Sequence, residues 1–243
     1  MINIRRRNLS LKLKETFFLY KKKPIYIFVL CPPFQGSTII TKLLDSSEFT
    51  SSFIDTSDWA GEGQKFINDP LYEENKWNPN YKLDMDMVKK CYDENWNLKK
   101  NIFVEKSPPM ICRAKMFEDY FSKFGDVYFI ISIRSPYSSR NSIKEWLKFA
   151  TYQKNNINIL NKTLVTSYEE ICNNKSYFIE KLINFIPELS TLKDNKYYGK
   201  KSLGNRFDEI NNNEVDRIIN LDKKKNLLSN EEDLIKFFGY EVK

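Results

Sequence analysis

The most constraining feature of this sequence is a continuous apolar run, IYIFVL, at residues 25–30. β-Branched and aromatic residues without polar alternation are typical of a strand that is buried on both faces, as in a parallel sheet. A turn-rich loop, CPPFQGST, follows at 31–38, and apolar residues then recur with helical spacing over 39–44. The first unit of the chain is therefore predicted to be a buried strand, a loop and a helix.

The remainder of the chain continues this alternation. Further strands are predicted at 101–105, 127–133 and 164–167, and helices at 85–96, 111–124, 138–152, 177–186, 214–221 and 231–238, whereas 45–80 is predicted to be irregular. Strands that alternate with helices predict an α/β protein with three layers and a central parallel sheet. Ligands of such sheets bind beyond the carboxyl ends of the strands, so we expect the chemistry in the loops that follow the four strands.

Length and charge predict one folded domain with a basic extension. The chain has 243 residues, of which 41% are hydrophobic, and this is enough for one sizeable core. No linker rich in Gly, Pro or Ser divides it, so a single domain is expected at 24–243. The net charge is +7, and a basic arm at 1–23 is rich in Lys and Arg. A solvated arm is the favoured interpretation, and attraction to nucleic acid or to an anionic membrane is the alternative.

The absence of histidine excludes several kinds of site. A Ser–His–Asp or Cys–His relay and a His-ligated metal are impossible, so any general base must be a carboxylate, Lys, Tyr or Cys. The four cysteines lack CxxC spacing, and neither a secretory signal nor an apolar run long enough to span a bilayer is seen. These features predict reduced thiols, no transmembrane segment and a cytoplasmic location.

The loop at 32–38 has the properties of an anion site. A loop of small residues between a buried strand and a helix offers free backbone N–H groups. Gly36 lets the backbone approach a phosphate closely, and Ser37 and Thr38 add hydroxyl donors. The loop differs from the nucleoside-triphosphatase P-loop, because no Lys precedes Ser37 and only one Gly is present. A plain strand–helix turn is the alternative interpretation.

The loop resembles that of the sulfotransferase superfamily, which reads Pro-x-(Lys or Arg)-Ser-Gly-Thr-Thr after a buried strand. The resemblance implies a P-loop-like sulfotransferase fold and binding of PAPS (3′-phosphoadenosine-5′-phosphosulfate). Its 5′-phosphosulfate would contact Pro33, Phe34, Gln35, Gly36, Ser37 and Thr38. Phe34 stands where the family has its basic residue. That replacement puts turnover, though not binding, in question.

The end of the third strand also resembles this family. Arg134 follows the apolar run at 127–133, and Ser142 comes eight residues later. In sulfotransferases an Arg and a Ser with this spacing bind the 3′-phosphate of PAPS. An Arg at a strand end can donate two hydrogen bonds to phosphate oxygens, and a Ser on the next helix can add a hydroxyl. A solvated strand-end charge is the alternative for Arg134.

Two shorter segments supply catalytic candidates. VEKSPP at 104–109 resembles a turn of tyrosylprotein and carbohydrate sulfotransferases, which makes Lys106 the best replacement for the missing loop cation, with Lys42 second. WAGEGQK at 59–65 resembles the "GEE" segment of tyrosylprotein sulfotransferases, whose Glu acts as base. By that match Glu62 is the candidate base, and Glu105 and Asp58 are the alternatives.

Two later segments resemble parts of the family that lie near the nucleotide. In LVTSYEEI at 164–171, the resemblance places Tyr168 near the nucleotide and gives Glu169 a mainly structural role. In KKSLGNR at 200–206, it places Lys201, Ser202 and Arg206 over the nucleotide. A surface basic loop is the alternative for the second segment.

Together these segments predict transfer of a sulfuryl group from PAPS to a hydroxyl or amine, without a metal. The acceptor is expected to be a small molecule, a carbohydrate or a peptide, and the sequence does not distinguish among these classes. One alternative is a catalytically impaired PAPS- or PAP-binding protein of the same fold, which the residues at 34 and 35 motivate. A divergent P-loop kinase and a nucleic-acid-binding module are the others.

Overall fold

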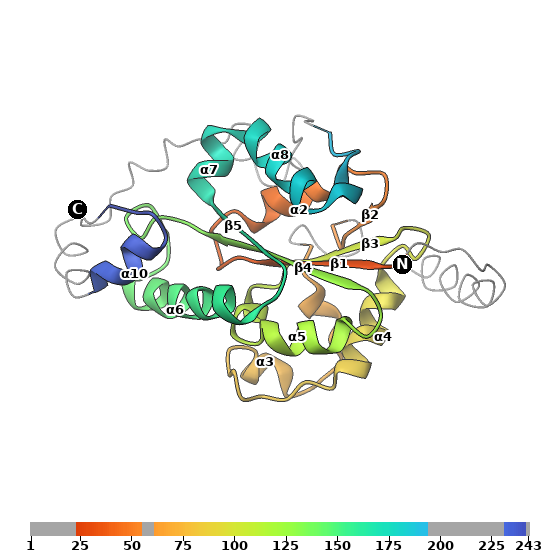
Figure 1. The fold of residues 1–243 in the computed structure, drawn as a ribbon. Coiled ribbons are helices and arrows are strands. Elements are labelled where there is room, and N and C mark those ends of the chain that lie inside the picture. Colours follow the sequence, from red (N-terminus) through yellow and green to blue (C-terminus); the bar gives the residue numbers. More distant parts are fainter. Residues whose placement is uncertain (1–22, 55–60, 194–230, 242–243) are drawn as a thin grey trace, which may run out of the picture.

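A computed structural model describes residues 23–54, 61–193 and 231–241. Its centre is a five-stranded parallel sheet with the order β2-β3-β1-β4-β5 (Figure 1). The strands are β1 (Ile25–Leu30), β2 (Thr50–Ser51), β3 (Ile102–Glu105), β4 (Asp126–Ile133) and β5 (Thr163–Ser167). The predicted parallel sheet is confirmed.

Helices follow the strands along the chain. The α-helices are α2 (Ser37–Asp45), α3 (Tyr72–Asn75), α4 (Met85–Asn95), α5 (Ala114–Phe121), α6 (Ile143–Ile159), α7 (Tyr168–Asn173), α8 (Lys175–Phe185) and α10 (Glu232–Phe237). Three short 3-10 helices are η1 (Gly63–Phe66), η2 (Pro108–Cys112) and η3 (Pro187–Leu189). No helix in these described ranges is long and apolar enough to cross a membrane.

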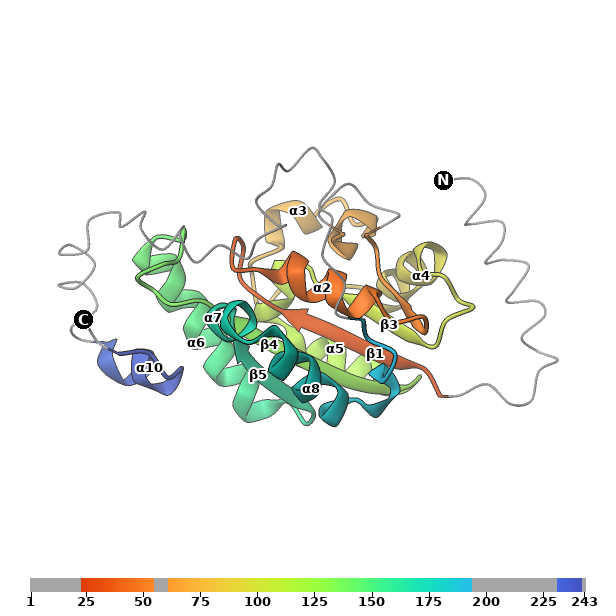
Figure 2. The same cartoon turned by 90° about the horizontal axis from the view of Figure 1, so that it is seen from above.

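The helices cover both faces of the sheet, which gives the three predicted layers. Ile25, Ile27 and Val29 of β1 pack with the apolar sides of α2, α7 and α8. Tyr26 and Phe28 point the other way and pack with α4 and α5. Figures 1 and 2 show the two groups of helices on opposite faces. The uninterrupted apolar run of β1 therefore has the predicted cause, because its side chains are buried in alternation on two faces.

Three local predictions differ from the structure. The segment at 45–80, predicted to be irregular, contains β2, η1 and α3, and α7 follows β5 without a loop. The helix predicted at 138–152 begins instead at Ile143, because Ser142 and Glu145 form a capping box there. Most of the basic arm and the helix predicted at 214–221 lie outside the described residues.

The parallel register places the ends of the strands at one edge of the sheet. Leu30 of β1 is paired with Ile131 of β4, and Ile133 of β4 is paired with Ser167 of β5. Phe28 of β1 is paired with Glu105, the last residue of β3. The segments that follow β1, β3, β4 and β5, where the chemistry was expected, therefore begin close together.

Candidate functional site

The loop between β1 and α2 contains two residues with left-handed backbone conformations. Gly36 has a φ of +98°, and a Cβ at this position would lie 2.5 Å from Cδ2 of Tyr168, so glycine suits both the turn and the neighbouring ring. Phe34 has a φ of 62°, which is strained for a bulky residue, and it is 70% exposed. Ser37 then begins α2. The loop thus presents a helix N-terminus, which attracts anions, at the carboxyl edge of the sheet.

Gln35 joins this loop to the segment that follows β4. Its side-chain amide donates to Asn141 Oδ1 at 2.8 Å and to Ser139 Oγ at 3.3 Å. Its Oε1 accepts a hydrogen bond of 2.8 Å from the backbone N–H of Arg134. The side chain is fully buried. Gln35 was predicted to contact PAPS, and its side chain lies between the two loops of the site.

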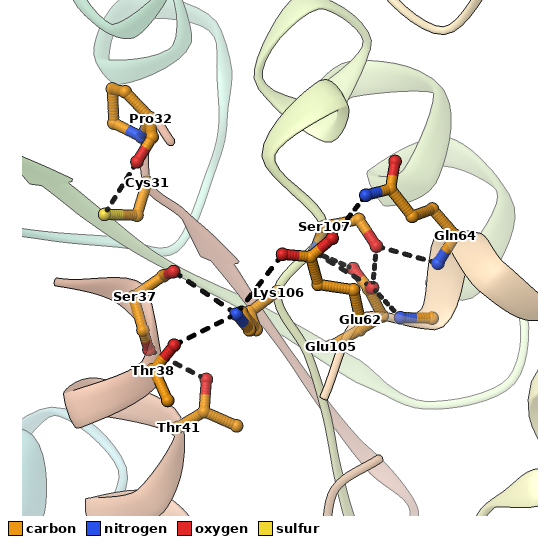
Figure 3. Close-up of polar contacts among 11 residues, drawn as sticks. Cys31, Pro32, Ser37, Thr38, Thr41, Glu62, Gln64, Glu105, Lys106 and Ser107 are labelled. Carbon is orange, nitrogen blue, oxygen red and sulfur yellow. Dashed lines mark hydrogen bonds and ion pairs between the residues drawn. The ribbon is translucent and has the colours of Figure 1, made fainter. Parts of the chain in front are cut away.

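Lys106 lies between the first turn of α2 and the Glu62 carboxylate (Figure 3). It follows the last residue of β3, and the alternation of side chains along a strand directs it to the face that α2 covers. Its Nζ lies 3.5 Å from Ser37 Oγ, 3.3 Å from Thr38 Oγ1 and 3.4 Å from Glu62 Oε1. Burial lowers the pKa of Lys106, and the neighbouring Glu62 carboxylate opposes that effect. The predicted cation, hydroxyl pair and base are therefore in contact.

Glu62 and Glu105, two candidates for the base, have different surroundings. The Glu62 side chain is 17% exposed, pairs with Lys106 and accepts a hydrogen bond from the Gln64 side-chain amide. Glu105 is fully buried, and this burial raises the pKa of its carboxyl group to about 7. Glu62 is thus the carboxylate that both touches Lys106 and reaches solvent. Asp58, the remaining candidate, lies outside the described residues.

Arg134 lies at the end of β4 against the first residue of α7. Its guanidinium carbon is 4.3 Å from the centroid of the Tyr168 ring, and its Nε donates to Ser138 Oγ at 3.1 Å. Within the described part of the chain, its two terminal nitrogens make no hydrogen bond. Glu169 accepts hydrogen bonds from the Ser135 backbone N–H at 3.0 Å and from Ser138 Oγ at 3.1 Å, and so supports this turn. The guanidinium therefore lies over the Tyr168 ring, and its terminal N–H groups are not used by the described residues.

The Ser142 hydroxyl contacts Glu145 and not Arg134. Its Oγ donates to Glu145 Oε2 at 2.8 Å and accepts from the Glu145 backbone N–H at 3.3 Å. The hydrogen bonds that the Ser142 hydroxyl and backbone N–H donate to the carboxylate lower the pKa of Glu145. The predicted pairing of Arg134 and Ser142 in one phosphate site therefore requires Glu145 to move, because a phosphate beside Ser142 would meet a negative charge.

The other predicted residues contribute less to this arrangement. Pro33 is half-buried in the loop, and Lys42 lies in the last turn of α2. Lys201, Ser202 and Arg206 lie outside the described residues. Within the described ranges, no three Cys, Asp or Glu side chains are grouped so that they could hold a metal ion.

Three residues of the site were missed by the sequence reasoning. Gly63 and Ser107 contact the Glu105 carboxylate. Tyr240, beyond α10, donates to Glu169 Oε2 at 2.9 Å and to the Ile133 carbonyl at 3.2 Å. Ser107 stands beside Lys106 in the sequence and could have been noticed for that reason. No local signal marks Tyr240, since its partners are far away along the chain.

The conformation of Phe34 gives a testable expectation. Asparagine tolerates the left-handed region better than alanine, and both remove the same exposed ring. We expect Phe34→Asn to be more stable than Phe34→Ala by about 1 kcal/mol, or about 2–4 °C in the midpoint of thermal unfolding followed by circular dichroism. Equal midpoints for the two variants would show that the backbone is relaxed at this position.

Comparisons with known proteins agree with this architecture. No protein-family model matches the chain, and no curated protein matches it. Among solved structures, the chain is similar to a sulfotransferase domain from the Synechococcus PCC 7002 olefin synthase, with a TM-score of 0.52 and 14% sequence identity. The likeness covers 93% of this chain and 98% of that domain. The chain therefore has a sulfotransferase-like fold.

Proposed function

We propose that the chain transfers a sulfuryl group from PAPS to a hydroxyl or amine acceptor. The observation that carries this proposal is the position of Lys106. Its Nζ lies 3.5 Å from the Ser37 hydroxyl and 3.3 Å from the Thr38 hydroxyl, in the first turn of α2. An ammonium group beside a helix N-terminus makes a strongly anion-attracting site, and Lys106 supplies the positive charge that Phe34 does not.

The two ends of the donor have separate candidate sites. The 5′-phosphosulfate suits the N-terminus of α2 with the hydroxyls of Ser37 and Thr38. The 3′-phosphate suits Arg134, whose guanidinium is stacked on Tyr168 with its centre 4.3 Å from the ring centroid. Ser142 joins that phosphate site only when Glu145 releases it. Binding of the donor in this way uses backbone N–H groups, hydroxyls and two cations, and needs no metal.

The transfer step follows from the contacts of Lys106 and Glu62. The acceptor oxygen or nitrogen attacks sulfur while Glu62 accepts its proton, and the bond between sulfur and the bridging phosphate oxygen breaks. The products are the sulfated acceptor and PAP (adenosine-3′,5′-bisphosphate), and Lys106 neutralises the charge that develops on the leaving phosphate. Such a step depends on positioning and on electrostatic stabilisation, as phosphoryl transfer does.

Ligand-dependent thermal stability tests the proposal. We expect PAP to raise the unfolding midpoint, because a ligand at a hundredfold excess over its Kd stabilises by roughly 2.7 kcal/mol. Arg134→Ala should lose most of this shift. Lys162→Ala is the matched control, since Lys162 pairs with Asp126 at the opposite end of β4, and it should keep the shift.

The same measurement separates the proposal from its rivals. A shift with ADP and Mg²⁺ but none with PAP would contradict the proposal and favour a divergent kinase. Binding of PAP without transfer of labelled sulfate from PAPS would favour a catalytically impaired PAP-binding protein, as the exposed Phe34 suggests. If neither nucleotide binds, salt-dependent nucleic-acid binding that is lost on removal of residues 1–23 would favour the remaining alternative.

A further inference from the structure

Glu105 is a fully buried carboxylate at the carboxyl end of β3. Side chains alternate along a strand, so Glu105 and Lys106 point to opposite faces of the sheet. Lys106 meets the first turn of α2, whereas Glu105 meets η1, the short helix that follows Glu62. An ionised group at such a depth is costly unless several donors satisfy it.

The donors to Glu105 come from two segments. The Gly63 backbone N–H donates to Oε1 at 2.8 Å, and the Ser107 backbone N–H donates at 2.9 Å. The Ser107 hydroxyl also donates to Oε1, and it accepts a hydrogen bond of 2.8 Å from the Gln64 backbone N–H. Glu105 and Ser107 together therefore hold two successive N–H groups of η1. Figure 3 shows Gln64 beside Ser107 in this arrangement.

The residue at position 63 fits this contact closely. A Cβ on Gly63 would lie 2.8 Å from Glu105 Oε1, 2.8 Å from Cε1 of Tyr92 and 2.6 Å from Cε2 of Phe53. Any side chain here would push η1 away from the carboxylate. Glycine thus lets the backbone rest directly on Glu105.

Holding Gly63 and Gln64 also fixes the residue before them. Glu62 lies directly before η1 and has an extended backbone, and its carboxylate reaches Lys106 with an Oε1–Nζ distance of 3.4 Å. The Gln64 side chain donates to the other oxygen of the same carboxylate. Movement of η1 away from β3 would therefore carry Glu62 away from Lys106.

We propose that Glu105 is a positioning residue that, with Ser107, holds η1 against β3 and so keeps the Glu62 carboxylate at the Lys106 ammonium. The effect of Glu105 on catalysis rests on the proposed sulfuryl transfer, whereas its attachment of η1 to β3 does not depend on that proposal. Glu105 itself touches neither solvent nor the predicted donor site.

The protonation state of Glu105 affects how strongly its carboxyl group holds η1. Burial raises its pKa to about 7, with Glu62 adding to the rise, and the hydrogen bonds from Ser107 and Gly63 oppose it. The other titratable groups that interact with it electrostatically are Tyr72 of α3 and Tyr92 of α4, on its own face of the sheet, and Lys106, on the opposite face. The ionised carboxylate is the stronger acceptor, so the hold on η1 strengthens as the pH rises through 7.

Folding stability has the opposite dependence on pH. The folded-state pKa lies above the ordinary value, so the folded protein binds this proton more tightly than the unfolded chain does. The contribution of Glu105 to stability is therefore fully present below about pH 4.5 and is lost as the pH rises through about 7. Glu105→Gln should remove this part of the pH dependence, because it keeps a neutral side chain of the same shape.

Hydrogen exchange at the Gly63 and Gln64 amides tests the positioning role without any ligand. Ser107→Ala removes the acceptor of the Gln64 N–H, and Glu105→Ala removes the acceptor of the Gly63 N–H. Each variant should let η1 open locally more often, and should therefore raise the exchange rates of these amides by at least about tenfold relative to the β1 amides. Glu105→Gln should retain most of the protection because its Oε1 can still accept. Unchanged exchange in both alanine variants would overturn the proposal.

Desulfation of PAPS, with water as the acceptor, tests the catalytic consequence. In Ser107→Ala and Glu105→Ala we expect kcat to fall about 10-fold to 100-fold, the loss expected when a general base is displaced, with a PAP Kd within threefold of the unsubstituted chain. Glu105→Gln should lose less, because its Oε1 can still accept the Gly63 N–H. The rise of kcat through about pH 7 should disappear in Glu105→Gln. Equal loss of PAP affinity and kcat would indicate a general structural defect and overturn the positioning role.

Glu118→Gln is the matched control. Glu118 is another buried carboxylate that accepts a backbone hydrogen bond, from Asn161 at 2.8 Å, and it lies on α5 away from the site. This substitution should leave the exchange at 63–64 and the desulfation rate unchanged. If the unsubstituted chain neither binds PAP nor releases sulfate, the proposed function fails, whereas the exchange result still decides the role of Glu105.

Discussion

Lys106→Met is expected to lower the rate of PAPS desulfation by about 10²–10³-fold, the usual loss when one preorganised group that stabilises developing charge is removed. Methionine keeps the length and the apolar stem of the side chain, so the change removes mainly the positive charge. The loss should be large because the side chain is 3% exposed and no other lysine is seen to contact the Ser37 and Thr38 hydroxyls among the described residues. PAP affinity should fall less than kcat, since Arg134 remains.

The measurement is the initial rate of sulfate release from labelled PAPS, beside PAP calorimetry. Lys89→Met is the control, because Lys89 is another largely buried lysine, paired with Asp93 on α4, and it lies over the Tyr26 ring near the start of β1. This control should keep the full rate. If Lys106→Met also keeps it, Lys106 is not the cation that replaces the loop residue of the family.

Gly36→Ala is expected to lower the free energy of unfolding by about 2–5 kcal/mol and to abolish detectable PAP binding. Two costs add: a left-handed φ disfavours any side chain by roughly 1–2 kcal/mol, and an overpacked contact costs about 1–3 kcal/mol. The overpacked contact is with Tyr168, whose Cδ2 would lie 2.5 Å from the new Cβ. The Arg134 guanidinium lies over the same Tyr168 ring, so displacement of Tyr168 is expected to disturb both predicted phosphate sites.

Gly239→Ala separates the two costs. Gly239 has a φ of +76° and nothing within 4 Å of a Cβ, so its substitution carries the conformational cost alone. Urea unfolding of the two variants should show the larger loss for Gly36→Ala. Equal losses would mean that the Tyr168 ring moves aside freely, and the coupling between the two phosphate sites would then be absent.

The strands were the most predictable part of the fold. β1 is an unbroken apolar run and β4 is mostly apolar, and both are rich in β-branched and aromatic residues, as is typical of strands covered on both faces. The order of the strands in the sheet was not predicted, because it depends on contacts between distant segments. The start of α6 was also misplaced, because the capping-box pattern of Ser142 and Glu145 was overlooked and the polar residues 138–142 were added to the helix.

The candidate site was predictable where a residue directly follows a strand. Lys106 and Arg134 both follow strands and were singled out because their segments resemble parts of the sulfotransferase family, and the parallel sheet brings their loops to one edge. The roles of Gln35 and Glu105 were harder to foresee. Gln35 meets partners 99 to 106 residues away, and Glu105 meets Gly63 across 42 residues, so no local pattern reports either contact. The spacing of Ser142 from Arg134 fits the family pattern, but the hydrogen bonds of Ser142 cap the N-terminus of α6.

The hydrogen bonds of Gln35 limit which residues can replace it. The family pattern places a serine at this position, and a serine side chain is too short to replace the contacts that Gln35 makes with Asn141 Oδ1 and the Arg134 N–H. Installing the family loop alone would leave the buried Arg134 N–H without its acceptor, at a typical cost of about 1–3 kcal/mol, and would leave Asn141 Oδ1 with Ser139 Oγ as its donor. The loop after β1 and the turn after β4 are thus expected to be exchanged between homologous proteins as one inherited unit.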